Sequence, residues 1–336
     1  MKENVLITGS AGFIGMHVVF TLLNKGYNII GVDSLNSYYD PELKFSRLKE
    51  CGISTQEFQK CGNQSSKFSN YSFFNFDIVN NEDIEYIFNQ YKIDIVIHLA
   101  AQAGVRYSIT NPETYIKNNI NGFYNIIDLS RRNNVKHFIY ASSSSVYGNT
   151  LEVPFKETMK VDKPVSLYAA TKKSNELIAH AYSEIYNLPT TGLRFFTVYG
   201  PWGRPDMAYF DFTKSIFNKK PINIFNEGLL SRDFTFIDDI VDGIYKVMIG
   251  RDTQNKPYEI LNIGNNKPVK LIDFINQLEK SIGISAIKNY VGMQKGDVNI
   301  TYSDIDKISS YGYEPNVNIA EGLSLFVEWY KLYYEK

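Results

Sequence analysis

The sequence contains only two cysteines, Cys51 and Cys61, which lie in a polar segment with no histidine nearby. There is no second cysteine pair to complete a zinc site, so we expect free thiols of a cytoplasmic protein. The four histidines, at positions 17, 98, 137 and 180, are scattered along the chain and show no metal-ligand spacing. These patterns predict a protein without a metal site.

An excess of charge of either sign is also missing. The 35 Lys and Arg residues balance 36 Asp and Glu residues, which leaves a net charge of −1 and excludes a sequence-wide basic surface for nucleic acid. No stretch approaches the roughly 20 apolar residues of a membrane span. The first residues lack the basic, apolar and small-residue order of a secretory signal. We therefore expect a cytoplasmic protein that binds neither nucleic acid nor membranes.

Short apolar runs alternate with helical periodicities through the first two-thirds of the chain. The runs that read as buried strands are NVLITG, NIIGVD, YSFFNFD, IDIVIHLA, VKHFIYAS and TTGLRFFTV. Near-continuous apolar character suits a parallel sheet that is covered on both faces. The alternation therefore predicts an α/β protein with a Rossmann-type, doubly wound parallel sheet.

Turn-forming residues become frequent after about Tyr199, which indicates a smaller second lobe. The later segments RDFTFIDDIVDGIYKVMIG and EILNIG can return to the first lobe, so the boundary is expected to be discontinuous. We predict a cofactor-binding domain of residues 1–198 plus about 233–264. The substrate-binding lobe then comprises residues 199–232 and 265–336.

Three glycines lie between the first predicted strand and the helix that follows it. In VLITGSAGFIG, Gly9, Gly12 and Gly15 permit a tight turn, a close approach of the backbone to a pyrophosphate, and close packing of helix on strand. Asp33 ends the next strand, where its carboxylate can accept hydrogen bonds from a ribose diol. The same carboxylate would repel a 2′-phosphate, so the pattern predicts NAD rather than NADP.

Tyr168 and Lys172 stand four residues apart on a predicted helix, so their side chains share a face. A free tyrosine has a pKa of about 10, which is too high for a base near neutrality. A neighbouring ammonium group and a positively charged nicotinamide both lower that pKa. Tyr168 can then take a proton from a substrate hydroxyl while the adjacent C–H leaves as hydride.

The ordered motifs TGSAGFIG, HLAAQAGVR, ASSSSVYG, YAATK and RDFTFIDDI resemble those of extended short-chain dehydrogenase/reductases that act on nucleotide sugars. This resemblance covers essentially the whole chain. It implies tightly held NAD, a nucleotide diphosphate sugar bound between the lobes, and Ser143 as a catalytic hydroxyl that assists proton transfer. Asn118 matches a family asparagine that supports the site, and a helix-packing role is the alternative for it. The implied cofactor contacts are Gly9, Gly12, Phe13, Ile14, Gly15, Asp33, Asn36, Asp77, Ile78, Leu99, Ala100, Ala101, Tyr168 and Lys172.

The residues after Ser143 distinguish the reactions of this family, which begin with the same oxidation at sugar C4. Enzymes that resemble 4,6-dehydratases carry an Asp-Glu pair there, and those that resemble UDP-glucuronate decarboxylases carry a Glu two positions on. This chain has Ser144 and Ser145 at those places. A hydroxyl cannot act as a general base at pH 7. What remains is oxidation, rotation of the ketone and hydride return to the opposite face, which is epimerisation.

The segment RFFTVYGPWGRPDMA closely resembles its counterpart in UDP-glucuronate 4-epimerases. Thr197 and Arg204, with Ser142 or Ser144, are candidates for binding a C6 carboxylate, since the planar guanidinium pairs with two oxygens. The alternative for Arg204 is a salt bridge within its loop. The resemblance further implies Arg232 at the diphosphate and Asp297 near the uridine ribose. The expected substrate contacts are Arg106, Ser142, Ser144, Thr197, Arg204, Arg232 and Asp297.

The leading hypothesis is an isomerase that converts UDP-glucuronate to UDP-galacturonate with bound NAD, for nucleotide-sugar metabolism and polysaccharide biosynthesis. Alternatives are a 4-epimerase of UDP-glucose, UDP-galactose or their N-acetylated forms, and a UDP-glucuronate decarboxylase. A net dehydrogenase that releases NADH and a protein that only binds NAD and a protein partner also stay open. The resemblance further suggests a homodimer formed through the helices around 111–133 and 165–187.

Overall fold

The structure is a computed structural model that describes residues 2–250, 257–292 and 298–335. The chain divides into two compact units. The first comprises Met1–Gly148, Lys160–Arg194 and Ile244–Leu261, and the second comprises Asn149–Met159, Phe195–Gly243 and Asn262–Lys336. Each unit has its own sheets, helices and set of polar contacts.

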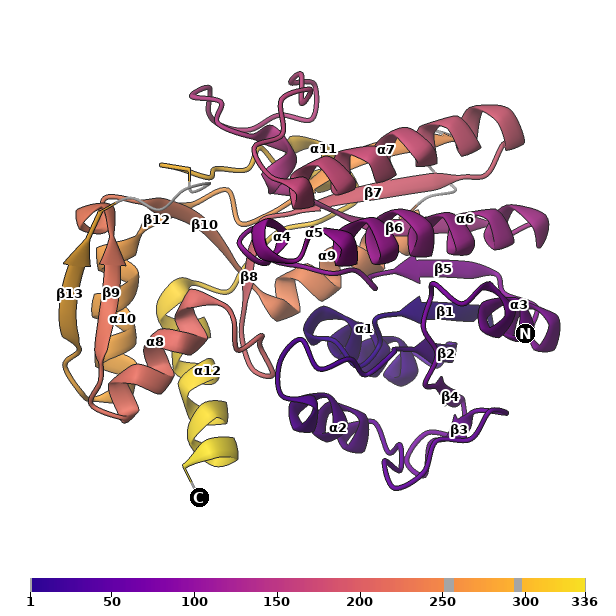
Figure 1. The fold of residues 1–336 in the computed structure, drawn as a ribbon, viewed down its shortest axis with the longest axis horizontal. Helices are drawn as coiled ribbons and strands as arrows, with labels where there is room; N and C mark the ends of the chain where they lie inside the picture. Colours follow the sequence, from indigo (N-terminus) through magenta and orange to yellow (C-terminus); the bar gives the residue numbers. More distant parts are fainter. Residues whose placement is uncertain (1, 251–256, 293–297, 336) are drawn as a thin grey trace. The chain divides into compact units, whose positions relative to one another are not determined.

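The first unit is built on an eight-stranded sheet with the order β11-β7-β6-β5-β1-β2-β4-β3 (Figure 1). β1 pairs in parallel with both β2 and β5, β2 pairs in parallel with β4, and β5 pairs in parallel with β6. The short strand β3 is antiparallel to its neighbour β4. The strands are β1 (Asn4–Thr8), β2 (Asn28–Val32), β3 (Asn63–Gln64), β4 (Tyr71–Phe74), β5 (Ile95–His98), β6 (His137–Ser143), β7 (Thr190–Phe195) and β11 (Tyr258–Ile263).

This strand order confirms the predicted Rossmann-type sheet. The chain runs outward from β1 through β2 to β4, and then returns to β5 on the other side of β1. Such a reversal opens a crevice at the carboxyl ends of the central strands, where doubly wound proteins bind their ligands. The strands are nearly continuous buried apolar runs, with β4 and β5 buried at every position.

The helices of this unit connect the strands and carry most of the predicted catalytic residues. Ser166 caps the longest of them, α7, by accepting a hydrogen bond at 3.1 Å from the amide of Ala169. The segment before α6 is a π-helix, η1, and a 3₁₀ turn, η2, follows β6. The helices are α1 (Phe13–Asn24), α2 (Pro41–Glu50), α3 (Asn81–Gln90), α4 (Tyr107–Thr110), α5 (Pro112–Tyr115), η1 (Ile116–Gly122), α6 (Phe123–Arg132), η2 (Ser144–Tyr147) and α7 (Leu167–Tyr186).

The second unit holds two small sheets. A three-stranded sheet has the order β12-β10-β8, and a two-stranded sheet pairs β13 with β9 in parallel. The strands are β8 (Thr197–Tyr199), β9 (Pro221–Phe225), β10 (Ser231–Phe236), β12 (Pro268–Lys270) and β13 (Ile287–Val291). The helices are α8 (Ala208–Phe217), η3 (Asn226–Gly228), α10 (Leu271–Ile282), α11 (Asp306–Ser309) and α12 (Ile319–Tyr334), while the residues of α9 (Ile237–Gly250) are divided between the units.

Candidate active site

The glycine turn between β1 and α1 is packed too tightly for larger residues. Gly9 adopts a left-handed conformation with φ of +73°, and a Cβ there would lie 2.8 Å from the amide nitrogen of Ala100. A Cβ on Gly15 would overlap the carbonyl oxygen of Gly9. Helix α1 begins at this turn, and its N-cap residue Gly12 provides no side-chain cap. A helix N-terminus of this kind, reached through a glycine turn, fits the pyrophosphate of a dinucleotide.

Asp33 lies directly after β2 and is held against the glycine turn. Its carboxylate accepts hydrogen bonds from the amide of Ala11 at 3.3 Å and from the amide of Leu35 at 2.9 Å. The buried ammonium group of Lys44, on α2, contacts Asp33 at 3.3 Å and the side chain of Asn36 at 3.2 Å. Lys44 therefore joins two of the predicted cofactor residues. The sequence prediction did not include Lys44, because a single lysine outside the recognised motifs is indistinguishable in sequence from a solvated one.

The other predicted cofactor residues follow two further strands of the same sheet, β4 and β5. Asp77 and Ile78 come after β4, and the segment 99–101 comes directly after β5. Asp77 accepts a hydrogen bond from the amide of Val79 at 3.0 Å. Because carboxyl ends of parallel strands meet at one edge of a sheet, these residues share that edge with the glycine turn and Asp33. The set fits a dinucleotide, with the carboxylate suited to a ribose diol.

Tyr168 and Lys172 occupy the first two turns of α7, as the spacing predicted. The ring of Tyr168 meets the ring of Tyr115 edge to face, with centroids 6.1 Å apart. Tyr115 is itself buried, and its hydroxyl donates a hydrogen bond to the carbonyl of Ala103 at 2.8 Å. The phenol of Tyr168 is therefore packed against a side chain that is anchored on the segment after β5.

Lys172 is buried and lies beside the strand that ends in Ser143. Its ammonium group donates a hydrogen bond to the carbonyl of Ala141 at 2.7 Å. Burial lowers the pKa of Lys172 to about 8, since removal of the ammonium group from water disfavours its charge. The structure thus brings Ser143, Tyr168 and Lys172 together within the first unit, on β6 and the adjoining helix α7.

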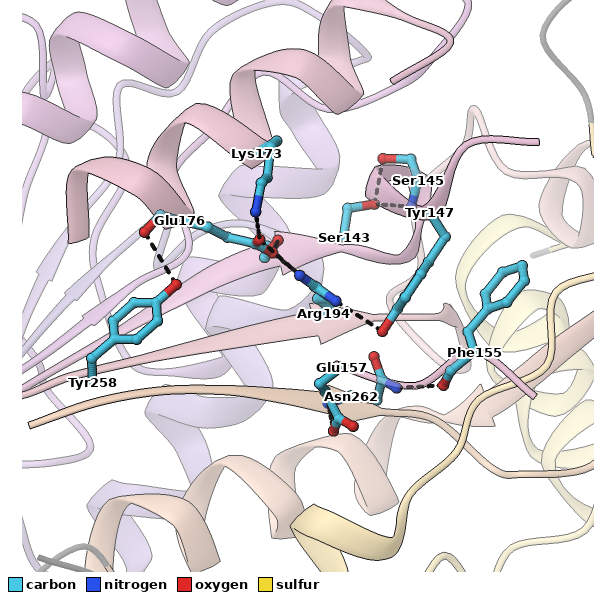
Figure 2. Close-up of polar contacts among 11 residues, drawn as sticks. Ser143, Ser145, Tyr147, Phe155, Glu157, Lys173, Glu176, Arg194, Tyr258 and Asn262 are labelled. Atoms are coloured by element: carbon cyan, nitrogen blue, oxygen red, sulfur yellow. Dashed lines mark hydrogen bonds and ion pairs between the residues drawn. The ribbon is translucent and has the colours of Figure 1, made fainter. Parts of the chain in front are cut away.

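Ser143 caps the 3₁₀ turn that follows β6. Its Oγ accepts hydrogen bonds from the amide of Ser145 at 3.2 Å and from the hydroxyl of Ser145 at 2.9 Å, as Figure 2 shows. A hydroxyl has two acceptor sites and one donor hydrogen. With both acceptor sites engaged by Ser145, the proton of Ser143 remains to be donated to a substrate oxygen.

Ser142 differs from Ser143 in the direction of its side chain and in the residues that surround it. Its side chain is only 2% exposed, and its hydroxyl donates a hydrogen bond to Oε1 of Glu176 at 2.7 Å. Successive side chains of a strand point to opposite faces, so Ser142 and Ser143 cannot both face one ligand. This geometry argues against the predicted contact of Ser142 with a substrate carboxylate, and the partly exposed Ser144 is the better candidate.

Asn119, rather than the predicted Asn118, supports the segment that follows β5. It is buried, accepts a hydrogen bond from the amide of Gln102 at 2.7 Å, and donates to the carbonyl of Gln102 at 3.0 Å and to the hydroxyl of Thr171 at 3.1 Å. Asn118 instead donates to the carbonyl of Thr114 in the preceding turn. Both asparagines lie on the π-helix η1.

The second unit contains Thr197 and Arg204. Thr197 is the first residue of β8 and pairs in register with Phe234 of β10. The guanidinium group of Arg204 forms a two-pronged ion pair with Asp206, with Nε to Oδ1 at 3.0 Å and Nη2 to Oδ2 at 2.5 Å. Asp206 was not part of the predicted site. This ion pair within the loop is the alternative role of Arg204, and the side of the guanidinium that could pair with a substrate carboxylate is engaged by Asp206.

The structure describes two of the three remaining predicted substrate residues. Arg232 lies on β10 and donates a hydrogen bond to the carbonyl of Ser231 at 2.9 Å. Arg106 precedes α4 in the first unit and is exposed. Asp297 lies outside the described residues.

Metal-ligating and membrane-spanning features were sought over residues 2–250, 257–292 and 298–335. In these ranges no three His, Cys, Asp or Glu side chains form a group that could hold a metal ion. No helix in the same ranges has the length and apolar character needed to cross a bilayer. Cys51 is buried, Cys61 is exposed, and both are free thiols.

Comparisons with known proteins agree with this geometry. The NAD dependent epimerase/dehydratase family matches residues 5–264. Protein CapI of Staphylococcus aureus is 48% identical, with 99% of each chain covered. A probable UDP-glucuronate 4-epimerase of Rhizobium meliloti is 40% identical, with 98% of each chain covered.

A solved structure is similar over nearly the whole chain. The UDP-glucuronic acid 4-epimerase from Bacillus cereus, in complex with UDP-glucuronic acid and NAD, has a TM-score of 0.87 and 33% identity. The match covers 98% of this chain and 100% of that one. Since the family match spans most of the chain and whole-length relatives exceed 30% identity, the chain belongs to the NAD-dependent epimerase/dehydratase family.

Proposed function

We propose that this protein is an NAD-dependent UDP-glucuronate 4-epimerase, which interconverts UDP-glucuronate and UDP-galacturonate through a 4-keto sugar. The observation that carries the proposal is the hydrogen bond from Lys172, one helical turn after Tyr168 on α7, to the carbonyl of Ala141, two residues before Ser143 on β6. Positions 144 and 145, which follow the catalytic hydroxyl, provide no carboxylate for elimination or decarboxylation. Names of relatives and structural neighbours support the same reaction and the same uronate.

The chain's own residues would handle the proton at the C4 oxygen. Tyr168 accepts the proton from the C4 hydroxyl, and the neighbouring ammonium group of Lys172 favours the phenolate form of the tyrosine. Ser143 donates its remaining hydroxyl proton to the same oxygen, because Ser145 engages both of its acceptor sites. Bound NAD supplies the reversible hydride chemistry at C4. Rotation of the keto sugar then presents its other face before Tyr168 returns the proton.

The cofactor would be held by residues that follow β1, β2, β4 and β5. We propose the glycine turn for the pyrophosphate and Asp33, with Lys44 and Asn36 beside it, for a ribose. Carboxylate recognition at C6 is assigned to Thr197, Arg204 and Ser144. Arg106, Arg232 and Asp297 remain proposed contacts to the rest of the UDP-sugar.

The reaction is tested by incubation of the purified protein with UDP-glucuronate, without added NAD, and identification of the product by NMR. We expect UDP-galacturonate, with a deuterium label at C4 retained in the product. Loss of the label to solvent, or accumulation of reduced coenzyme, would contradict the scheme. Parallel incubations with UDP-glucose and UDP-N-acetylglucosamine test the alternative epimerases, and a UDP-pentose product would identify a decarboxylase.

We also propose a homodimer. Apolar side chains between 45% and 68% exposed lie on η1, α6 and α7, namely Ile116, Tyr124, Leu177, Ile185 and Tyr186. Burial of such side chains against a second copy would remove them from water. Light scattering during size-exclusion chromatography should give twice the chain mass for the wild type, and one chain mass after Leu177→Glu with Ile185→Glu. The predicted cytoplasmic location is tested by cell fractionation.

A further inference from the structure

A buried ion pair lies one helical turn beyond the catalytic lysine. Glu176 follows Lys172 by four residues on α7, and its side chain is 1% exposed. Arg194, on β7, donates from Nε to Oε1 at 2.8 Å and from Nη2 to Oε2 at 2.9 Å, so the pair is two-pronged (Figure 2). Lys173 adds a contact to Oε2 at 3.3 Å. None of these charged groups has a role in the proposed chemistry.

The carboxylate of Glu176 is also bound to the strand that carries Ser143. Ser142 donates its hydroxyl to Oε1 at 2.7 Å, and Lys172 donates to the carbonyl of Ala141 at 2.7 Å. Helix α7 therefore binds two consecutive residues of β6, and the next residue is Ser143. The strand end that presents the catalytic hydroxyl is attached to the helix that presents Tyr168.

Arg194 extends the network to the other side of Ser143. Its Nη1 donates a hydrogen bond to the hydroxyl of Tyr147 at 3.0 Å, and its guanidinium group lies 4.8 Å from the centre of that ring. Tyr147 ends the 3₁₀ turn that begins after Ser143, and Ser145 in this turn donates to Ser143. The ion pair thus holds both the strand before Ser143 and the turn after it.

Buried charges are a costly way to fill a protein core. Well-packed apolar residues of similar volume are often equally stable or more stable, so a buried ion pair is weak support for a purely stabilising role. Burial raises the pKa of Glu176. Arg194, Ser142 and Lys173 together lower the pKa by more than burial raises it, so the pKa lies below its ordinary value. The group is therefore a carboxylate at neutral pH and accepts all of these hydrogen bonds.

We propose that Glu176 and Arg194 are positioning residues, which act through Ser142 and Tyr147 to hold the hydroxyl of Ser143 in register with Tyr168. The inference rests on the proposed function of Ser143. Small displacements of a catalytic group have large effects on rate. The ion pair links β6 and the adjoining turn η2 to α7 and β7, and we infer that this linkage fixes the distance between Ser143 and Tyr168.

The first test removes the hydrogen bond between Ser142 and Glu176 and leaves the ion pair intact. Ser142→Ala should lower kcat about 10-fold or more with little change in the KM for UDP-glucuronate. The deuterium isotope effect on kcat for C4-labelled substrate should rise, because cleavage of the C4–H bond becomes slower relative to other steps. Ser142→Thr, which keeps the hydroxyl, should restore kcat.

Ser183→Ala is the matched control. Ser183 is also buried on α7, and its hydroxyl donates to the carbonyl of Pro257 at 2.6 Å, away from Ser143 in the chain. Both alanine variants lose one buried hydrogen bond, so similar changes in Tm are expected. If Ser142→Ala changes kcat and the isotope effect no more than Ser183→Ala does, the inference is wrong.

The second test removes both charges, since either single variant would leave an unpaired buried charge and is expected to lose much of its stability. Glu176→Gln combined with Arg194→Met should fold with NAD bound and a Tm near that of the wild type, yet show the kcat defect of Ser142→Ala. A folded double variant with wild-type kcat would overturn the inference. This separation of stability from activity is not expected of a pair that only stabilises the core.

A crystal structure of the double variant makes the test independent of the substrate. We expect Ser143 to move relative to Tyr168 by about 0.5 Å or more, the tolerance of a catalytic constellation. An unchanged position would overturn the inference even if another UDP-sugar proves to be the substrate. A wild-type protein that does not convert UDP-glucuronate would overturn the proposed substrate alone.

Discussion

Lys172 donates a hydrogen bond from its buried ammonium group to the carbonyl oxygen of Ala141, 2.7 Å away. The acceptor lies two residues before Ser143, so the lysine is bound to the strand that presents the catalytic hydroxyl. Burial lowers the pKa of Lys172 from 10.5 to about 8. The protonated form that the proposed mechanism requires is therefore disfavoured by folding.

This shift predicts a pH dependence of stability. A lysine whose folded-state pKa lies below its unfolded value destabilises the protein fully below about pH 8, and the effect vanishes as the pH approaches 10.5. Relative to a Lys172→Met variant, the wild type should gain about 2 kcal/mol of unfolding free energy between pH 7 and pH 9.5. Denaturant titration of both proteins measures this gain. Parallel pH profiles would contradict it, and kcat of the variant should fall about 100-fold or more.

His98 predicts a second pH dependence, which has the same origin, the burial of a cationic group, but lies at lower pH. It ends β5, its Nδ1 lies 2.8 Å from the hydroxyl of Thr8, and burial followed by the charge of Lys172 lowers its pKa to about 3. Stability from a neutral buried histidine is present above pH 6.5 and is lost as the pH falls toward the folded-state pKa. Between pH 7 and pH 5, the unfolding free energy of the wild type should fall by about 2 kcal/mol more than that of a His98→Asn variant. The asparagine keeps a polar group that can bond to Thr8. If the wild type and the variant lose equal unfolding free energy, His98 is not the source of the pH dependence.

Gly15 provides a test of the cofactor site. A Cβ at this position would overlap the carbonyl oxygen of Gly9, so Gly15→Ala must displace the glycine turn. We expect NAD binding to weaken about 10-fold or more, measured as the NAD content of the purified protein and by titration calorimetry. Gly292→Ala is the control, because a Cβ added at Gly292 would have no neighbouring atom within 4 Å. Equal NAD contents of the two variants would exclude the proposed cradle.

The carboxylate of the substrate creates a hazard once C4 is a ketone. A β-keto acid loses CO₂ when the carboxyl bond lies perpendicular to the carbonyl plane, and Thr197, Arg204 and Ser144 are proposed to prevent that orientation. Thr197→Val and Arg204→Ala should therefore release more UDP-pentose per epimerisation event than the wild type, as measured by chromatography. Wild-type levels of UDP-pentose in both variants would show that these residues do not control the orientation. Lys219→Ala, on another loop of the second unit, serves as the control.

Local patterns were sufficient for much of the fold and part of the site. The strand, glycine turn, helix and Asp33 follow one another within a short segment, so the doubly wound sheet and its cofactor edge were predictable, and the strand order confirms the fold. The pairing of Tyr168 with Lys172 was equally accessible, because helical spacing alone places them on one face.

Contacts between distant segments were not predictable in this way. The carboxylate of Glu176 meets Ser142, which is 34 residues earlier in the chain, and Arg194, which is 18 residues later. Lys44 joins Asp33 to Asn36 only because α2 packs beside the end of β2. Asn119 meets Gln102, which is 17 residues earlier in the chain, and Thr171, which is 52 residues later.

The sequence by itself determined the order of strands and helices, the glycine turn, the proposed catalytic tyrosine and lysine, and the absence of carboxylates at positions 144 and 145, because periodicity and residue type are local properties. Only the tertiary structure decided which of the adjacent serines remains partly exposed and which is buried against Glu176. The reason is that successive side chains of a strand point to opposite faces of the sheet, but which face is buried depends on where helix α7 packs. Helix α7 is remote from β6 in the chain, so the strand sequence alone does not decide this.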